Sequence, residues 1–232
     1  MDHLTALDQL PLLDLIALIF VILSWLLIGW LIEHPTPKRS SVTMLMAQFH
    51  RDWVKVFVER DPRIFDSQVL GILRQGTAFF ASTSILVLGG LLALMGNVDP
   101  LRGVAEQVGA VEMSALIWQL KFALVAFFVT NAFLKFVWAH RVFGYGTVMM
   151  AAVPNDPKAP DAYDRAMQAA ELNIRAVINF NRGLRALYFA LGALGWIIGG
   201  AGLIVTTLIV IWVLWSREFA SVPRKILLNG QP

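Results

Sequence analysis

Three polar side chains within one apolar stretch are the residues of this sequence best suited to chemistry inside a membrane. Lys121, Asn131 and Lys135 interrupt a run of apolar residues from about 113 to 138. Fourteen residues make about four helical turns, so the two lysines lie within roughly 40° of one helix face. A polar face turned into a helical bundle would suit a path for an ion or anion. The alternative is that Lys121 reaches outward to the membrane surface and Lys135 anchors the helix at the interface.

Two further groups of polar residues are candidates. Ser82, Thr83 and Ser84 lie within the apolar run 77–95, where hydroxyls either bond to a neighbouring helix or contact a ligand. Asp66 and Arg182 lie just outside predicted membrane spans, among other acidic and basic residues. They are expected either to form ion pairs at the membrane surface or to belong to a gated network or substrate site.

Signatures of catalysis are absent from the sequence. It contains no cysteine, which excludes thiolate metal sites and cysteine nucleophiles. The four histidines have no HxxxH or HExxH spacing, although His34 and His140 are expected at similar depth, where a metal or haem is a minor alternative. Phosphate-binding and nucleophile-elbow motifs are also missing. We therefore predict no enzyme activity, no catalytic residue, no cofactor and no metal.

The composition points to a membrane protein. Of the 232 residues, 57% are hydrophobic and 15% are charged, whereas soluble domains carry about 25% charged residues. The mean hydropathy is +0.65. These values exclude a disordered chain and a nucleic-acid-binding domain.

Four segments are long enough to cross a membrane as helices, which takes about 20 apolar residues. The segment 186–216 contains no charged residue, so it is expected to form one tilted span and is too short for two. No lysine or arginine precedes the first segment, so we interpret that segment as a retained helix rather than a secretory signal. The predicted spans are 11–32, 77–95, 113–138 and 186–216.

The two long connections between spans are predicted to be helical. Apolar residues recur at helical spacing in 42–59 and again in 161–182. The second and fourth spans are expected to extend into this helical layer. The connections carry 13 of the 19 basic residues, which predicts that they are cytoplasmic and that both termini are not. The apolar stripes are expected to pack on each other or to dock on a partner protein or on lipid.

Several stretches of the chain resemble a known family. They are 51–53, 61–68, 79–84, 120–123, 133–138, 169–173, 180–190 and 217–219. Together they look like the bacterial membrane proteins grouped as domain of unknown function 599, over about residues 45 to 220. The resemblance implies one four-helix domain in a bacterial inner membrane. It implies no activity and no catalytic residue.

The sequence thus predicts an all-α membrane protein with four transmembrane helices, of which the second and fourth extend into a cytoplasmic helical layer. The expected role is that of a structural or accessory subunit, acting through protein or lipid contacts. The expected partners are membrane lipids and either further copies of the chain or a larger membrane complex, without nucleic acid. The alternative is a small oligomeric ion channel or transporter with a polar path near Lys121.

Overall fold

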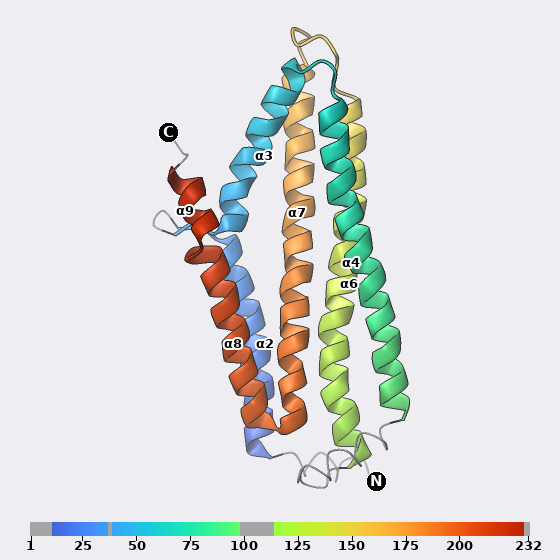
Figure 1. Cartoon of the computed structure of the whole chain (residues 1–232), viewed down its shortest axis with the longest axis vertical. Coiled ribbons are helices and arrows are strands. Elements are labelled where there is room, and N and C mark those ends of the chain that lie inside the picture. The colour runs from blue at the N-terminus through green and yellow to red at the C-terminus, as the bar shows by residue number, and fades with distance from the viewer. Residues whose placement is uncertain (1–10, 37–38, 98–113, 230–232) are drawn as a thin grey trace. The chain divides into compact units, whose positions relative to one another are not determined.

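The computed structural model describes residues 11–36, 39–97 and 114–229, and this part of the chain is helical apart from turns and one isolated bridge between Thr36 and Arg39. The prediction of an all-helical chain is therefore confirmed. The helices, shown in Figure 1, are α2 Leu12–Glu33, α3 Val42–Glu59, α4 Ile64–Gly96, α6 Ala115–Ala151, α7 Ala162–Ala193, the short 3₁₀ helix Leu194–Ile198, α8 Gly200–Phe219 and α9 Val222–Asn229.

Four stretches of the described residues are long and apolar enough to cross a membrane, as predicted. Three of them are α2, α4 and α6, which contain the expected spans 11–32, 77–95 and 113–138 apart from residues at their ends. Met113 lies outside the described residues. The fourth stretch is Gly200–Asn229.

The fourth span differs from the prediction, because 186–216 is not one helix. Helix α7 ends at Ala193, and after the 3₁₀ helix the chain passes through Gly199, whose φ is 107°. Helix α8 then returns beside the end of α7 (Figure 1). Thr206 Oγ1 donates to Gly192 O at 2.6 Å across this hairpin. Only glycine readily adopts such a φ, and an unbroken apolar run does not reveal a reversal.

The chain divides into two compact units, and the boundaries fall inside helices. Unit 1 comprises Met1–Trp30, Ser84–Ala132 and Leu184–Trp215. Unit 2 comprises Leu31–Thr83, Phe133–Gly183 and Ser216–Pro232. Each long helix from α2 to α8 except α3 therefore contributes residues to both units.

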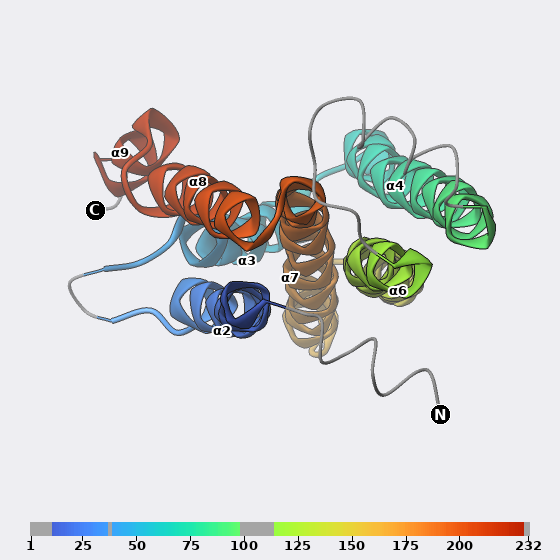
Figure 2. The same ribbon diagram turned by 90° about the horizontal axis from the view of Figure 1, so that it is seen from below.

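Unit 1 is held together by aromatic and small side chains. Phe128 is fully buried, lies edge-on to Trp25 and contacts the ring of Phe189. Helices α2 and α8 lie side by side in both views (Figures 1 and 2). Gly195 permits the α7–α8 hairpin to close, since a Cβ there would lie 2.7 Å from the carbonyl oxygen of Gly202. Backbone atoms cannot move aside as a flexible side chain can, so the hairpin depends on these glycines.

Unit 2 packs its amphipathic helices against each other. Helix α3 begins and ends at the predicted residues, with Ser41 as its N-cap. Its residues Val54, Phe57 and Val58 are buried in one cluster with alanines of α7, Leu70 of α4 and Met150 of α6. Helix α3 runs beside α7 in Figure 1. The stripes thus bury one another, as the first of the two sequence interpretations predicts.

The segment after Ser216 also belongs to unit 2. Glu218 accepts hydrogen bonds from the Thr43 amide at 3.0 Å and from its hydroxyl at 2.9 Å. Arg224 Nε donates to Ser40 O at 2.9 Å. The C-terminal helix α9 is therefore attached to the connection between the first two spans.

Candidate functional site

Unit 1 contains a buried pair of opposite charges. Asp14, in the first turn of α2, and Lys121, in α6, are 3% and 1% exposed. Asp14 is the charged group that interacts electrostatically with Lys121, and the Lys121 ammonium lies 5.4 Å from the centre of the Trp118 ring. Since charges are costly within lipid unless paired, this pair is the first candidate functional site.

The carboxylate of Asp14 also fixes the α7–α8 hairpin. Its Oδ2 accepts a hydrogen bond from Trp196 Nε1 at 2.8 Å, and its Oδ1 accepts one from the Gly200 amide at 2.8 Å. The positive end of the α8 dipole favours this carboxylate. Asp14 therefore connects the start of α2, the hairpin and, through charge, Lys121.

The other residues of the predicted polar path do not share this environment. Asn131 belongs to unit 1 and Lys135 to unit 2, and both are half-buried. Ser82 and Thr83 are exposed, whereas Ser84 is buried. The three hydroxyl groups therefore do not lie on one side of helix α4.

Arg182 takes part in an ion pair of unit 2. Its Nε donates to Glu33 Oε1 at 2.9 Å, and a second guanidinium nitrogen bonds to Oε2. This two-point pairing raises the pKa of Arg182 above its ordinary value. The pair joins the end of α2 to α7 and agrees with the ordinary interpretation of Arg182 as an ion-pairing residue.

Asp66 is buried at the start of α4 in unit 2. Its Oδ1 accepts a hydrogen bond from Trp53 Nε1 at 2.6 Å and one from Arg60. Its Oδ2 is buried and accepts no hydrogen bond from the described residues. An unsatisfied carboxylate oxygen is costly in a protein interior, so Asp66 is a second candidate for function.

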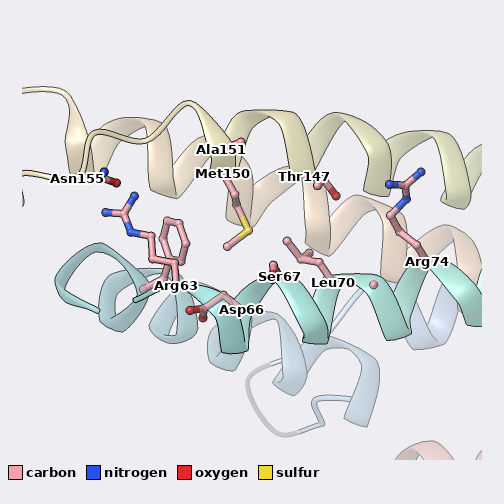
Figure 3. Close-up of a pocket in the computed structure, with 11 residues that line it drawn as sticks. Arg63, Asp66, Ser67, Leu70, Arg74, Thr147, Met150, Ala151 and Asn155 are labelled. Atoms are coloured by element: carbon pink, nitrogen blue, oxygen red, sulfur yellow. The ribbon is translucent and has the colours of Figure 1, made fainter. Parts of the chain in front are cut away.

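A cavity of about 310 Å³ lies between α4 and the end of α6, and Asp66 lines it. In Figure 3, Arg63 and Asn155 lie at one end, Arg74 lies at the other, and Met150 extends between them toward α4. The Nε of Arg74 is buried and donates no hydrogen bond to the residues that the structure describes. The cavity thus combines an apolar wall with two polar atoms, Asp66 Oδ2 and Arg74 Nε, that make no hydrogen bond to the described residues. Its full lining is Phe57, Arg63, Asp66, Ser67, Leu70, Gly71, Arg74, Thr147, Met150, Ala151 and Asn155.

Arg63 supports the wall of this cavity. It donates to the carbonyl oxygens of Val153 at 2.9 Å and Pro154 at 2.8 Å. Its guanidinium lies 4.4 Å from the centre of the Phe57 ring. Because its donors are used on the chain itself, Arg63 is a structural residue rather than a free cation.

Metal binding finds no support in the described part of the chain. No group of three histidine, cysteine or acidic residues lies close enough together there to hold an ion. His140 Nδ1 instead lies 3.1 Å from the Thr77 hydroxyl. Burial lowers the pKa of His50 below its ordinary value, which favours the neutral ring.

Sequence reasoning missed three participants in these sites. Asp14 could be assigned to the helix dipole from its place in the first turn, but its partner Trp196 is 182 residues away. No sequence feature near Trp196 indicates that it bonds to Asp14. Arg74 was visible only as one basic residue before an apolar run, and its lack of a partner is a property of the fold.

Comparison with protein families gives one match, which covers most of the described helices. The matching family model is described as a protein of unknown function, DUF599, and it covers residues 16–223. Neither the curated proteins nor the solved structures include a match. The matched range runs from the first turns of α2 to the start of α9 and includes Lys121, Asp66 and Arg74. The chain therefore belongs to the DUF599 family.

Proposed function

We propose that this protein is a non-enzymatic accessory membrane protein that assembles with further copies of itself or with a larger membrane complex. The observation that carries the proposal is the pairing of the charges in unit 1. Asp14 accepts two hydrogen bonds and interacts electrostatically with Lys121, so its carboxylate is committed to the fold. The exposed positions of Ser82 and Thr83 also argue against a polar path along α4.

Helix α4 supplies the surface for assembly in this proposal. In the most apolar stretch of α4 only 17% is buried, whereas 44% of the corresponding stretch of α6 is buried. Leu86 is 76% exposed, and large apolar side chains follow on either side. In a membrane such a surface contacts lipid or the helices of another protein, so the expected partners are lipids and a second copy or a different subunit.

The proposed orientation places unit 2 in the cytoplasm. Unit 2 holds 16 of the 19 basic residues. The positive-inside rule favours this arrangement. In this orientation the end of α7 passes outward through the membrane and the hairpin at Gly199 turns the chain back into α8. This extra passage puts the C-terminal segment in the cytoplasm, while the start of α2 stays outside. A bacterial inner membrane is the proposed location, because bacterial outer-membrane spans are β-barrels.

Native mass spectrometry of the protein released gently from its own membranes tests the accessory role. The expected result is a mass that contains this 25.8 kDa chain together with a different subunit or further copies. We expect Leu86→Ala to weaken that complex. The control is Leu191→Ala, at another exposed leucine (65%), and it should leave the complex intact. A single copy with lipid alone would contradict the proposal.

Cysteine labelling tests the orientation, and the chain contains no native cysteine. Asn97→Cys follows α4, and Ser221→Cys precedes α9. In intact cells, a membrane-impermeant maleimide should label the cysteine at 97 directly and the one at 221 only after permeabilisation. Labelling of both from the outside would overturn the orientation.

A second candidate function is ion transport, favoured by the burial of Lys121 in an apolar helix. Ionisable residues at such positions mark ion paths in many membrane proteins. A path requires water to reach Lys121. If the accessory role holds, a charged thiol reagent should leave Lys121→Cys unmodified in sealed liposomes while modifying the half-buried control Lys135→Cys. Rapid modification at 121 would favour transport.

A further inference from the structure

The cavity between α4 and α6 contains two groups of opposite charge, each with one buried atom that makes no hydrogen bond to the described residues. Asp66 is 1% exposed and its Oδ2 accepts no hydrogen bond from the described residues, while Arg74 Nε is buried and donates none. No acidic side chain of the described chain forms an ion pair with Arg74. Buried charges cost free energy unless they are paired and hydrogen-bonded. Both groups therefore favour a ligand.

The charge around the cavity selects an anion. Arg74 stands alone at one end, and at the other end Asp66 is accompanied by Arg60 and Arg63. Three guanidinium groups against one carboxylate leave the surroundings positive. A guanidinium binds a phosphate through two parallel hydrogen bonds, which suits the unpartnered end.

The Asp66 end requires a neutral donor. An ammonium group there would be repelled by Arg60, which already bonds to Asp66, and by Arg63 nearby. A hydroxyl donates to a carboxylate oxygen without carrying charge. The ligand should therefore combine a phosphate with a hydroxyl group.

The position of the cavity along α4 indicates that this ligand is a lipid. Arg74 precedes the apolar run that begins at Thr77, so it lies where headgroups meet acyl chains. Ala78 and Ala81 follow Arg74 by four and seven residues, so they lie on the same helix face as Arg74. Ala78 is exposed, so acyl chains can lie along this face. Asp66 is eight residues before Arg74, about 12 Å along the axis and away from the apolar run. That is the span of a phosphoglycerol headgroup with a hydrogen bond at each end.

We propose that the cavity between α4 and α6 binds the headgroup of phosphatidylglycerol, with its phosphate on Arg74 and its glycerol hydroxyl on Asp66. Leu70 and Met150 form the apolar wall between these two contacts. This site does not depend on the accessory role, because a transporter could hold the same lipid. Basic pockets beside membrane helices are a common form of anionic lipid site.

Lipid titration of the full-length, delipidated protein tests the proposal by native mass spectrometry. Phosphatidylglycerol should bind more tightly than phosphatidylethanolamine or phosphatidylcholine. Arg74→Gln should weaken its binding about tenfold, the usual effect of losing one charge-assisted hydrogen-bonding group. The control Arg175→Gln removes an exposed arginine of the same unit and should have no effect. Equal binding by wild type and Arg74→Gln would overturn the proposal.

A second variant separates loss of the site from loss of the fold. Gly71 lines the cavity, and a Cβ added there would meet no atom within 4 Å, so Gly71→Leu starts from an open position and places its longer side chain in the space of the cavity. It should abolish phosphatidylglycerol binding at an unchanged melting temperature. The control Gly144→Leu, at another open glycine, should retain binding. Retention of the lipid by Gly71→Leu would contradict the proposed site.

Competition with glycerol phosphate distinguishes a lipid from a soluble phosphate ester. The proposal predicts that an excess of glycerol phosphate leaves phosphatidylglycerol bound, because the soluble molecule lacks acyl chains to contact Ala78 and Ala81. Displacement at equal concentrations would assign the cavity to a soluble ester and overturn the lipid assignment.

Discussion

The buried charge pair Asp14 and Lys121 of unit 1 and the exposed ion pair Arg51–Glu171 of unit 2 hold charge in opposite surroundings. In unit 1, Asp14 and Lys121 are both almost fully buried, and the carboxylate also bonds to Trp196 and Gly200. In unit 2 an ion pair such as Arg51–Glu171 has side chains that are 36% and 45% exposed. A buried pair is costly to break because each charge is left in an apolar surrounding, whereas an exposed pair is replaced by water.

This comparison teaches where the fold depends on single polar residues. In unit 1, one carboxylate connects three elements, so its loss should affect the whole unit. In unit 2, apolar packing of α3, α4, α6 and α7 carries the fold, and the exposed ion pairs add little. Five predictions test this contrast.

The largest effect is expected from Asp14→Asn. The substitution leaves the buried Lys121 without its opposite charge and should lower the free energy of unfolding by about 4 kcal/mol. The double variant Asp14→Asn/Lys121→Met removes both charges and should recover most of that loss. Chemical unfolding in detergent, followed by tryptophan fluorescence, measures both. Additive losses in the double variant would show that the two residues are not coupled.

Gly202→Ala should have the next largest effect. A Cβ at this position would overlap the carbonyl oxygen of Gly195 within the α7–α8 hairpin, and we expect a loss of about 3 kcal/mol. Gly90→Ala is the control, since its added Cβ would meet nothing within 4 Å. The same unfolding experiment should find the control at least as stable as wild type, because alanine favours a helix over glycine. Equal stability of Gly202→Ala would refute the close approach of the two helices.

In unit 2, Trp53→Phe should cost about 2 kcal/mol, because Asp66 then loses a buried hydrogen bond to a charged oxygen. The bond joins Trp53 Nε1 to Asp66 Oδ1 at 2.6 Å. Trp212→Phe, at a tryptophan that is 68% exposed, provides a matched control with little expected change. A melting experiment on both variants decides whether Asp66 needs this donor, and identical melting temperatures would mean that it does not.

Removing the exposed pair should have a small effect. Arg51→Gln, Glu171→Gln and the double variant complete a mutant cycle whose coupling energy we expect to be about 0.5 kcal/mol. High salt should reduce it further. A coupling energy equal to that of Asp14 and Lys121 would remove the contrast between the units.

The smallest effect is a pH dependence due to His50. Burial lowers its pKa in the folded protein, so the unfolded chain binds more protons and stability rises with pH. The contribution is complete above about pH 6.5, the ordinary pKa of histidine, and is lost as the pH falls through the folded pKa. Melting temperatures of wild type and His50→Gln across this range measure it. If the melting temperatures of the two proteins change in parallel with pH, His50 does not contribute to the pH dependence of stability.

The sequence predicted the parts of the fold that follow from local composition. The apolar runs identified α2, α4 and α6, and periodicity identified both ends of α3. The reversal at Gly199 could not be predicted, since the uncharged run 186–216 continues through it and its glycines suit a hairpin and a close helix contact equally. Only the φ of 107° distinguishes the two.

The candidate site was predicted in part. Lys121 was identified because a charge in an apolar run is conspicuous, and Asp66 and Arg182 because they flank such runs. Their partners lie far away in the sequence, as Asp14 does from Lys121 and Glu33 does from Arg182. Helical spacing placed Lys135 near the face of Lys121, but it could not reveal that one is buried and the other half-buried.

An ion flux assay on sealed liposomes that contain the purified protein tests the central claim most directly, namely that the buried charge of unit 1 is structural. The account predicts no flux of protons, cations or anions above that of protein-free liposomes, for wild type and for Lys121→Met alike. A flux through the wild-type protein that disappears in a folded Lys121→Met variant would contradict the account and assign Lys121 to a transport path.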